Sequence, residues 1–597
     1  MTFALTPTER YLSVLAAYRW PVVIALVTLV LLAVHHLWFS VSRDSSFSVS
    51  LALASIPLLT LLTLLLDSKL VFRIVFWLVA LCTGYAAMDF LLTGTRAYFP
   101  LADPNNFVTL LYLVWVPWLH QQFLAKANRS VDLLVVGVAS FAFGLALLAT
   151  ESRFALFVLL VGAVYWWLGV AFAGLNVRRI ISATVGAACA GALFFSLSGA
   201  PAAELADVAQ EIQSVTASQA DGAMVARLAL LESAWQLITQ HGAGIGTGIY
   251  TFSLFYPGVR SVLEQDTAGL FVHNDYVQLF MEGGVLLTLP LLIVLVWVAA
   301  VWLKSLFSWR IWSMRHGYLA ALSFTLMHAL VNFTFYILPV AFLIGVVLAN
   351  VFAAEPEAEA QTAIERGKSA AWLLRGGLLA SGLWVSALLG LDAMTYAVFS
   401  GQQGMPFSGV LKADAQAQAA YAETAIRLNP DRGIPQYARA RLLEAHAAQP
   451  GSGIQHEDVH RAYELAVQTD PYNPELLHQF AQHLRRQGQV VEAGVLLSRA
   501  VQLDPANADI ALSAIDLELG RNDRAAALTI AAGAMQWCEL LARRNPQALD
   551  RLGSGIRPLV DAGSASHRQA LAACRVHRQQ AQATQRESVW LMRLFNP

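Results

Sequence analysis

The chain contains 597 residues, of which 57% are hydrophobic and only 13% are charged. This composition is too apolar for one soluble domain and predicts an all-α, polytopic membrane protein. The formal net charge is −1 and the lysines and arginines are scattered. The chain therefore offers no basic surface for nucleic acid, and we exclude that class of partner.

Eleven apolar windows of roughly 17 to 22 residues are each long enough to cross a hydrocarbon core. They begin near Trp20, Ser48, Val71, Phe107, Val131, Phe154, Ile180, Gly284, Gly317, Leu338 and Trp372. Arg10 and Arg19 precede the first window, and no small-residue cleavage site accompanies it, which predicts an uncleaved anchor. We therefore expect about 11 or 12 transmembrane helices.

The cations predict the orientation of these helices. With Arg10 and Arg19 in the cytoplasm, alternate connections collect the positive charges, as the positive-inside rule requires. These charges are Lys69, Arg73, Lys126, Arg129, Arg178, Arg179, Lys304, Arg310, Arg315, Arg366 and Lys368. We expect a multi-pass protein of the bacterial inner membrane whose C-terminal region lies in the periplasm.

This topology divides the chain into four expected parts. Residues 1–199 form transmembrane helices 1 to 7, and residues 200–283 form a periplasmic loop. Residues 284–395 form helices 8 to 11, and residues 396–597 form a periplasmic helical domain.

The C-terminal region contains an internal repeat. The stretch AVQTDPYNP at 466–474 recurs as AVQLDPANA at 500–508. The distance between the two starts equals the tetratricopeptide period of about 34 residues. An earlier copy, AIRLNP at 425–430, lies more than one period before the stretch at 466, and the insertion AAQPGSGIQHED accounts for the surplus. Such helix pairs stack into a solenoid, which predicts a surface for a protein partner or a brace within an assembly.

Four cysteines fall into two groups. Cys82 and Cys189 lie within predicted spans and are interpreted as packing residues. Cys538 and Cys574 lie in the expected periplasmic region, where oxidation is permitted, so a disulfide between them is one hypothesis and two free thiols are the other.

Two motifs could be mistaken for catalytic signatures. HEDVH at 456–460 matches the zinc-binding pattern H-E-x-x-H, but it opens a helix inside a repeat insertion, so we interpret it as structural. GAGIGTGIYTF, from Gly242, follows a helical pattern rather than a strand, which is the wrong order for a dinucleotide fold. Its glycines, Gly244 and Gly246 among them, let the backbone turn tightly or approach a ligand, or belong to a plain outer loop.

Three charged or titratable residues are expected at the outer membrane boundary. Arg153 precedes the sixth span, Arg227 lies on the amphipathic helix of the outer loop, and His273 lies just before the eighth span. Taken singly, each could extend into water. Together, two guanidiniums can hold phosphate oxygens and an imidazole can act as a base, which predicts an anionic, diphosphate-like ligand.

Four stretches resemble the O-antigen ligase and polymerase superfamily, bacterial membrane glycosyltransferases that include the general O-oligosaccharyltransferases. They are ESRFAL around Arg153, RLALLESAWQLITQHGAGIGTGIYTF from Arg227, HNDYVQLFMEGG from His273 and MHALVNF from Met327. Two positions depart from the family pattern: Phe154 replaces a glycine, and Asn332 stands where aspartate is usual.

The resemblance implies a GT-C type helical fold and a donor glycan carried on undecaprenyl diphosphate, with no nucleotide and no catalytic metal. Arg153 and Arg227 would hold the diphosphate, and His273 would activate the acceptor hydroxyl. Supporting residues would be Asn274, Glu282, Gly244, Gly246 and His328. Because the glycosyl diphosphate is already activated, such a site needs mainly positioning, charge stabilisation and a base.

The acceptor stays open at this point. It could be lipid A core, the end of another glycan or a protein hydroxyl, and the repeats mildly favour an enzyme that engages a protein or an assembly. A transporter of the same lipid, or a scaffold subunit of a polysaccharide export machine, is the alternative from another class. Transporters tend to place such residues near mid-membrane, whereas these cluster at the outer face, which favours chemistry.

Overall fold

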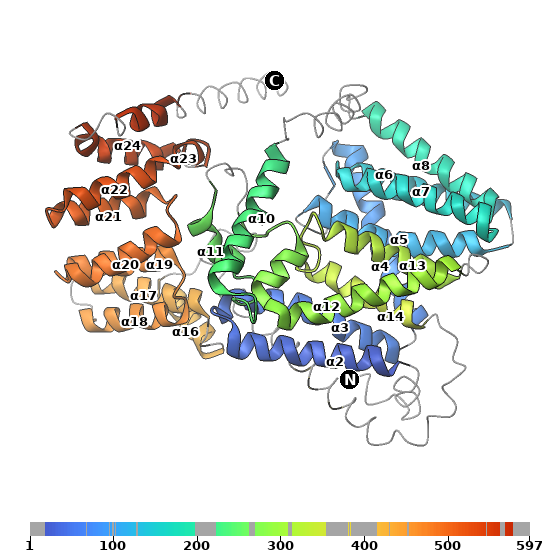
Figure 1. Ribbon diagram of the computed structural model, residues 1–597, viewed down its shortest axis with the longest axis horizontal. Helices are drawn as coiled ribbons and strands as arrows, with labels where there is room; N and C mark the ends of the chain where they lie inside the picture. The colour runs from blue at the N-terminus through green and yellow to red at the C-terminus, as the bar shows by residue number, and fades with distance from the viewer. Residues whose placement is uncertain are drawn as a thin grey trace.

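The structure is a computed structural model that describes residues 18–353, 376, 380, 383 and 415–579. Gaps within these ranges fall at 67, 95, 98–100, 102, 127–128, 198–221, 262–268, 308–312, 429, 431, 450–452, 545, 562–567 and 577–578. In the described residues all regular secondary structure is helical, which confirms the predicted all-α class. The helices form a bundle and a C-terminal tail (Figure 1).

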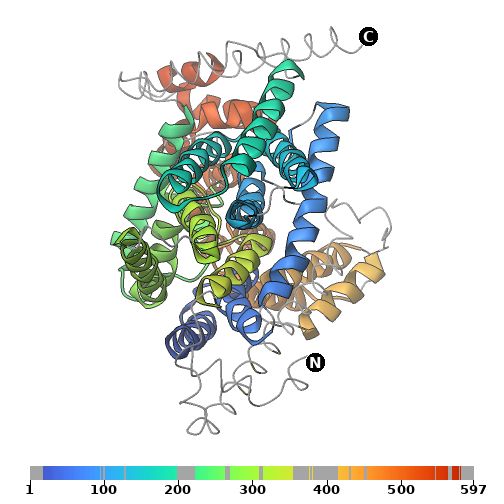
Figure 2. The same cartoon turned by 90° about the vertical axis from the view of Figure 1, so that its right-hand side faces the viewer.

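The bundle and the short helices at its end come first in the chain. They are α2 (Arg19–Val34), the π-helix η2 (His35–Phe39), α3 (Arg43–Leu65), α4 (Ser68–Thr93), α5 (Pro104–Leu124), α6 (Ser130–Leu148), α7 (Arg153–Ala173), α8 (Val177–Leu197), α10 (Gly222–His241), α11 (Phe252–Val259), α12 (Asp275–Phe307), α13 (Met314–His328) and α14 (Leu338–Ala353). Several of them are seen nearly end-on in Figure 2.

Ten of the eleven predicted windows begin on helices of the bundle. Seven helices in the described part are long and apolar enough to span a membrane, which supports a multi-pass membrane protein. The window from Trp372 lies almost entirely outside the described residues, and Arg10, Arg366 and Lys368 also lie outside them.

Hydropathy alone did not separate spanning helices from enclosed ones. α14 has 16 residues and so reaches about 24 Å, short of the roughly 30 Å of a hydrocarbon core. Its side chains, including Val340, Ala341 and Val346, are buried among neighbouring helices. An enclosed core helix and a membrane span are similarly apolar, because both lack contact with water.

The tail consists of α16 (Ala415–Leu428), α17 (Gly433–Ala447), α18 (His456–Thr469), α19 (Pro474–Arg486), α20 (Val490–Leu503), α21 (Ala508–Gly520), α22 (Arg524–Met535), α23 (Cys538–Arg544) and α24 (Pro546–Asp561). The starts of α18 and α20 are separated by the same number of residues as the starts of α19 and α21. This separation equals the distance in sequence between the two matched stretches. The helices thus follow the sequence repeat, while its assignment as a tetratricopeptide array stays a prediction.

Local signals in the tail match its helix boundaries. The side chains of Asn473 and Asn507 accept hydrogen bonds from backbone N–H groups in the first turns of α19 and α21. These caps satisfy donors that the helix leaves unpaired. Cys538 and Cys574 form a disulfide, which confirms that hypothesis.

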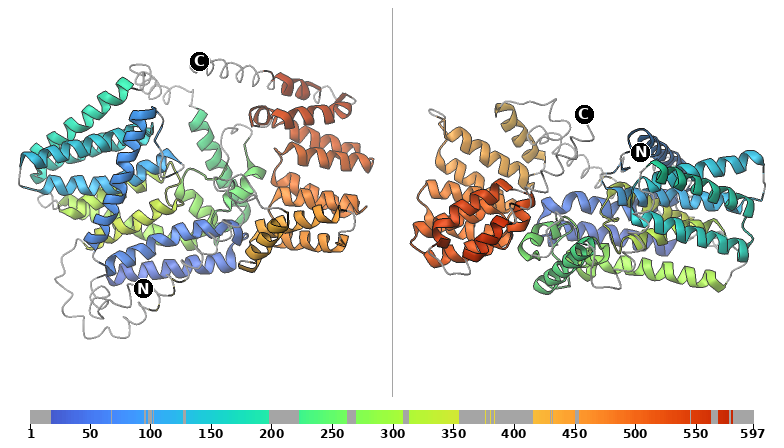
Figure 3. Two further views of the ribbon diagram at one scale, coloured as in Figure 1. Left: turned by 180° about the vertical axis from the view of Figure 1, so that it is seen from behind. Right: turned by 90° about the horizontal axis from the view of Figure 1, so that it is seen from above.

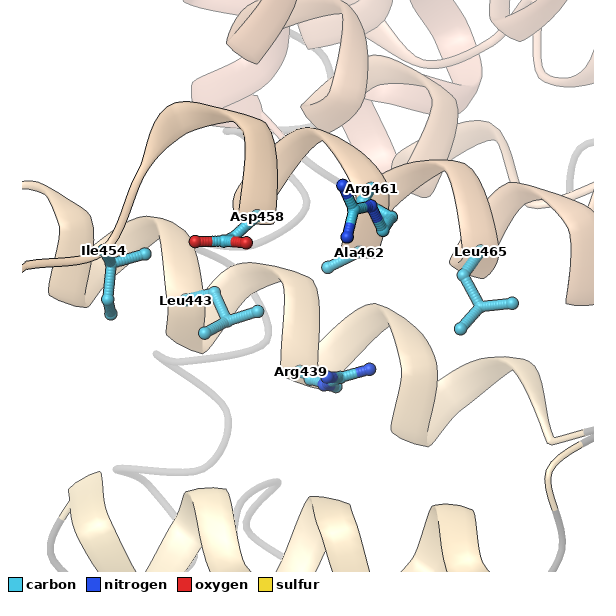
Figure 4. Close-up of a pocket in the computed structure, with 7 residues that line it drawn as sticks. All are labelled: Arg439, Leu443, Ile454, Asp458, Arg461, Ala462 and Leu465. Atoms are coloured by element: carbon cyan, nitrogen blue, oxygen red, sulfur yellow. The ribbon is translucent and has the colours of Figure 1, made fainter.

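A groove of about 300 Å³ lies between α17 and α18 of the tail. Figure 4 shows Arg439 and Leu443 on one helix and Asp458 and Arg461 on the other. Arg439 also pairs with Glu423 at 2.8 Å. None of the predicted site residues lines this groove.

Figure 3 shows where the predicted site lies relative to these parts: α10 and α11 stand between the bundle and the tail. At the same end, the start of η2 is hydrogen-bonded to the loop that follows α10, and the start of α12 is hydrogen-bonded to the turn between α13 and α14. We call this the site end of the bundle. It brings together segments that are far apart in the chain, such as those carrying His35 and Ile245.

Candidate active site

The loop at 242–251, here the glycine-rich loop, crosses α12 where that helix is interrupted. Gly284 has a φ of 59° inside α12. The N–H of Gly248 donates to the carbonyl of Glu282 at 2.8 Å, and the N–H of Val285 donates to that of Ala243 at 3.0 Å. Two stretches of backbone therefore run side by side at the break.

The glycines allow this close approach. A Cβ added at Gly246 would lie 2.3 Å from the carbonyl oxygen of Glu282, and one added at Gly284 would lie 2.4 Å from that of Gly244. A Cβ at Gly244 itself would meet nothing within 4 Å. Of the two glycines predicted to support the site, Gly246 is thus required by backbone packing and Gly244 is not.

Glu282 is a buried carboxylate that joins three segments. Its Oε1 accepts from the N–H of Phe252 at 3.2 Å and from Gln278 Nε2 at 3.0 Å. Its Oε2 accepts from the hydroxyl of Tyr336 at 2.9 Å. Glu282 thus connects α12 with the start of α11 and with the turn before α14.

The first transmembrane helix also reaches this loop. His35 is fully buried at the start of η2, and its Nε2 donates to the carbonyl of Ile245 at 2.9 Å. The N–H of Val41 donates to the carbonyl of Thr247 at 3.0 Å. Sequence reasoning missed His35, although two adjacent histidines ending an apolar span are a signal, since polar groups are costly there.

The start of α12 holds the turn at 329–337. Asp275 Oδ2 accepts from the N–H and hydroxyl of Thr334, at 2.8 and 2.6 Å, and from the N–H of Phe335 at 3.0 Å. The N–H of Asp275 donates to the carbonyl of Ala329 at 2.8 Å. Asp275 belongs to the HNDY stretch, yet we did not predict it as a site residue.

Asn274 serves two purposes at the same junction. Its Oδ1 accepts from the N–H groups of Tyr276 and Val277, both at 3.1 Å, and so caps the first turn of α12. Its Nδ2 donates to the carbonyl of Leu330 at 3.0 Å. It thereby fixes the helix start against the turn at 329–337.

His273 stands immediately before this capped helix. Its φ is 58°, a left-handed conformation that is uncommon outside glycine. Its ring lies edge-on to Phe333, with centroids 5.1 Å apart, and Phe333 stacks on Phe271 at 4.1 Å. The imidazole is therefore held by backbone geometry and by two aromatic rings.

A second cluster surrounds His328 at the end of α13. The ring of Phe154 stacks on it, with centroids 3.8 Å apart and planes 5° apart, and Thr109 Oγ1 lies 2.7 Å from its Nδ1. Phe154 thus fills the place left by the family's glycine with an aromatic contact. Asn332 Nδ2 donates to Asn106 Oδ1 at 3.2 Å, so the unusual amide takes part in a buried network.

The two predicted arginines come from different directions to this cluster. Arg153 begins α7, one residue before Phe154, and its side chain lies outside the described part. Arg227 is exposed on α10, a helix that packs against α12. The helix start carrying Arg153 lies beside His328 through the ring of Phe154.

Arg96 is a further cation at this end that sequence reasoning missed. Its Nε donates to the carbonyl of Thr150 at 2.6 Å and lies 3.9 Å from a carboxylate oxygen of Glu151. Both residues belong to the turn that precedes Arg153. The signal was weak, because one arginine between two spans carries no motif.

Backbone conformations of high energy gather at the site end. Among the described non-glycine residues, positive φ values occur at Glu151, Tyr250, His273 and Asn522, and only the last lies in the tail. Each costs about 1 kcal/mol or more. Such strain persists where surrounding structure holds it, and it often marks functional sites.

In the described residues, no three His, Cys, Asp or Glu side chains are placed to hold a metal ion. In the HEDVH stretch, His456 Nδ1 lies 3.0 Å from Gln487 Nε2, and His460 Nε2 lies 3.4 Å from Glu464. Its two histidines thus interact with side chains of the tail.

Comparison with protein families gives an independent result for this region. Residues 138–292 match the family model described as O-antigen ligase. The chain contains an O-antigen ligase domain. This finding confirms the superfamily predicted from the four stretches, and with it a general role in glycan transfer of the ligase or polymerase kind. Among proteins of curated function, none matches the chain.

The O-antigen ligase domain contains most of the predicted site. It spans the second half of α6, then α7, α8, α10, α11 and the first half of α12. It holds Arg153, Arg227, Gly244, Gly246, His273, Asn274 and Glu282, and it ends before His328. The family implies lipid-linked glycan and acceptor substrates in general.

Proposed function

We propose that the protein transfers or polymerises a glycan carried on undecaprenyl diphosphate at the periplasmic face of the inner membrane. The observation that carries this proposal is the convergence at the site end. Two stretches of the ligase domain, at Phe154 and His273, contact His328 or the turn at 329–337, and the helix carrying Arg227 packs against α12. An imidazole and two arginine-bearing helices are then available to one substrate.

In this proposal His273 is the general base. It removes the proton from the acceptor hydroxyl while that oxygen attacks the anomeric carbon of the donor sugar. The bond from that carbon to the diphosphate oxygen breaks, and undecaprenyl diphosphate leaves with the electron pair. An imidazole suits this task because its ordinary pKa lies near neutral pH.

Arg153 and Arg227 are proposed to hold the diphosphate. Guanidinium groups bind phosphate oxygens in a bidentate manner and stabilise the charge that grows on the leaving group. The exposure of Arg227 on α10 fits a ligand that arrives from outside the bundle. Lipid linkage fits a site at the end of membrane helices, because the reactive head group emerges there.

Asn274, Glu282 and Gly246 are proposed to keep His273 in place. The hydrogen bonds of Asn274 and Glu282 fix the start of α12 against its surroundings. His328 supports the other cluster through its stack on Phe154.

The experiment incubates the purified protein with a lipid-diphosphate-linked repeat unit alone and then sizes the glycans. Lengthening that disappears in His273→Ala identifies a polymerase. If the glycan stays unlengthened, lipid A core and acceptor protein are added in separate reactions. We expect His273→Ala to reduce transfer about 100-fold or more, with membrane insertion intact.

Arg227→Ala tests the diphosphate assignment in the same assay. We expect weaker binding of the lipid diphosphate, with Arg227→Lys intermediate, because lysine keeps the charge but loses the bidentate geometry. Transfer that is equal in wild type and His273→Ala would reject the proposed base. No transfer by the wild type to any of the three acceptors would instead favour the transport or scaffold alternative.

A further inference from the structure

The tail packs one aromatic side chain against a hydrophobic cluster at the site end. Tyr472 lies in the connection between α18 and α19, and its ring meets that of Phe255 edge-on at 4.9 Å. Phe255 belongs to a hydrophobic cluster formed by α10, α11, Val272 and Met281, and Tyr472 packs against this cluster. From the tail side, the guanidinium of Arg499 lies 5.7 Å from the Tyr472 ring centre.

The repeat itself does not require an aromatic residue at this position. In the next repeat the equivalent residue is Ala506, and both copies continue with a capping asparagine, Asn473 or Asn507. The turn therefore forms with alanine as well. The ring of Tyr472 makes its contribution outside the repeat, against α11.

The C-terminal end of α11 is also fitted to the tail. A Cβ at Gly258 would lie 2.7 Å from the carbonyl oxygen of Gln502 in α20. Arg260 follows α11 and lines a pocket together with Asp504 of the tail. The positive charge of Arg260 acts on that carboxylate. Backbone approach, aromatic packing and charge thus join α11 to the tail at three places.

The N-terminal end of α11 reaches the site. The N–H of Phe252, the first residue of the helix, donates to Glu282 Oε1. Phe252 and Tyr256 are fully buried in the cluster that also holds α10, the helix carrying Arg227. α11 has eight residues and so spans about 12 Å from the tail to this carboxylate.

We infer that Tyr472 is a positioning residue for the O-antigen ligase domain, acting through α11 on Glu282 and the glycine-rich loop. The tail is then part of the frame of the transfer site, in addition to any partner that it binds. This inference rests on the proposed function for its effect on catalysis, while its structural part can be measured without any substrate.

The test compares Tyr472→Ala, Tyr472→Phe and, as a matched apolar truncation elsewhere on the tail, Leu465→Ala, all in the full-length protein. The first measurement is hydrogen–deuterium exchange of residues 247–256. We expect exchange to become at least about tenfold faster in Tyr472→Ala, because local opening becomes easier, and to stay unchanged in the other two variants. Unchanged exchange in Tyr472→Ala would overturn the inference.

The second measurement is His273-dependent glycan transfer. We expect Tyr472→Ala to lower kcat about tenfold or more with little change in KM for the donor, since misplacement of a positioning group affects the chemical step. Tyr472→Phe should restore the rate. A rate in Tyr472→Ala equal to wild type, or a loss shared by Leu465→Ala, would contradict the inference. If the wild type shows no His273-dependent transfer, the proposed function fails. Hydrogen–deuterium exchange then decides by itself whether Tyr472 positions α11.

Discussion

Asp275 at the site end and Glu444 in the tail are both carboxylates held by several hydrogen bonds, but their partners differ in kind. Asp275 is fully buried, and two of its three donors are backbone N–H groups. Glu444 of the tail keeps some exposure and bonds to the side chains of Tyr463, His483, Arg441 and Arg486. Backbone partners fix geometry whatever the neighbouring side chains are, whereas side-chain partners can be exchanged.

The two regions should therefore be sensitive to different kinds of substitution. The site end depends on positions where backbone meets backbone, as at Gly246 and Gly284. The tail depends on helix packing and on pairs of side chains between neighbouring repeats. Substitutions that add one methyl group should therefore damage the first region most, and substitutions that remove one charge should be tolerated better in the second.

The largest effect is expected from Gly246→Ala. Its φ of 79° is unfavourable for alanine, and its Cβ would lie 2.3 Å from the carbonyl of Glu282. We expect a loss of stability of about 2–4 kcal/mol and loss of His273-dependent transfer. Gly244→Ala is the matched control, because its Cβ has open space, and its Tm should stay close to wild type. Equal Tm values for Gly246→Ala and Gly244→Ala would contradict the expected sensitivity of the site end to methyl groups added where backbone meets backbone.

A smaller effect is expected from Glu444→Gln in the tail. Burial alone would raise the pKa of Glu444, but hydrogen bonds from His483 and Tyr463 and the charges of Arg486 and Arg441 lower it to about 2. Removing the charge should cost about 1–3 kcal/mol at pH 7, because its donors lose an ionised acceptor.

The pH dependence of this effect has a definite sign. Because the folded state lowers the pKa, the ionised carboxylate stabilises the tail fully above its ordinary value of 4.5, and this is lost as pH falls towards 2. The stabilities of wild type and Glu444→Gln, measured by thermal unfolding, should therefore differ at pH 7, approach each other below about pH 4.5 and converge only near pH 2. A constant difference across this range would show that Glu444 acts by shape alone.

The smallest effect is expected from Arg551→Ala. Arg551 contacts Asp509 through two nitrogens, with its shortest distances at 2.9 Å, and both side chains are about half exposed. Exposed pairs of this kind contribute about 0–1 kcal/mol, and salt screens them. Tm should change by no more than a few degrees at low salt and not at all at 1 M salt. A large drop at high salt would show a packing role for the arginine stem.

Much of the architecture could be predicted from local sequence. The all-α class and ten helices of the bundle followed from hydropathy, and the regular spacing of the tail helices followed from two matched stretches. Which apolar helices are enclosed, such as α14, depends on packing between distant segments. That information is not contained in any single window.

The candidate site divides in the same way. His273, Arg227 and Gly246 could be predicted as site residues because they belong to contiguous stretches with a recognisable pattern, and their roles stay predictions. His35, Arg96 and Tyr472 were missed because each acts on a segment far away in the chain. Asp275 was missed for another reason: most of its hydrogen bonds to the turn at 329–337 are made with backbone groups, which leave no sequence signal.

The left-handed residues at the site end have a consequence for engineering. Glu151, Tyr250 and His273 each adopt a backbone conformation that glycine reaches without penalty. Relief of backbone strain alone would therefore favour glycine at these three positions. In His273 the same exchange would remove the imidazole proposed as the base, so heat resistance and turnover compete for a single residue. At Tyr250 the exchange would remove the ring that packs on Phe271, whereas the side chain of Glu151 is about half exposed, so Glu151 is the position where the strain can be relieved without touching the imidazole.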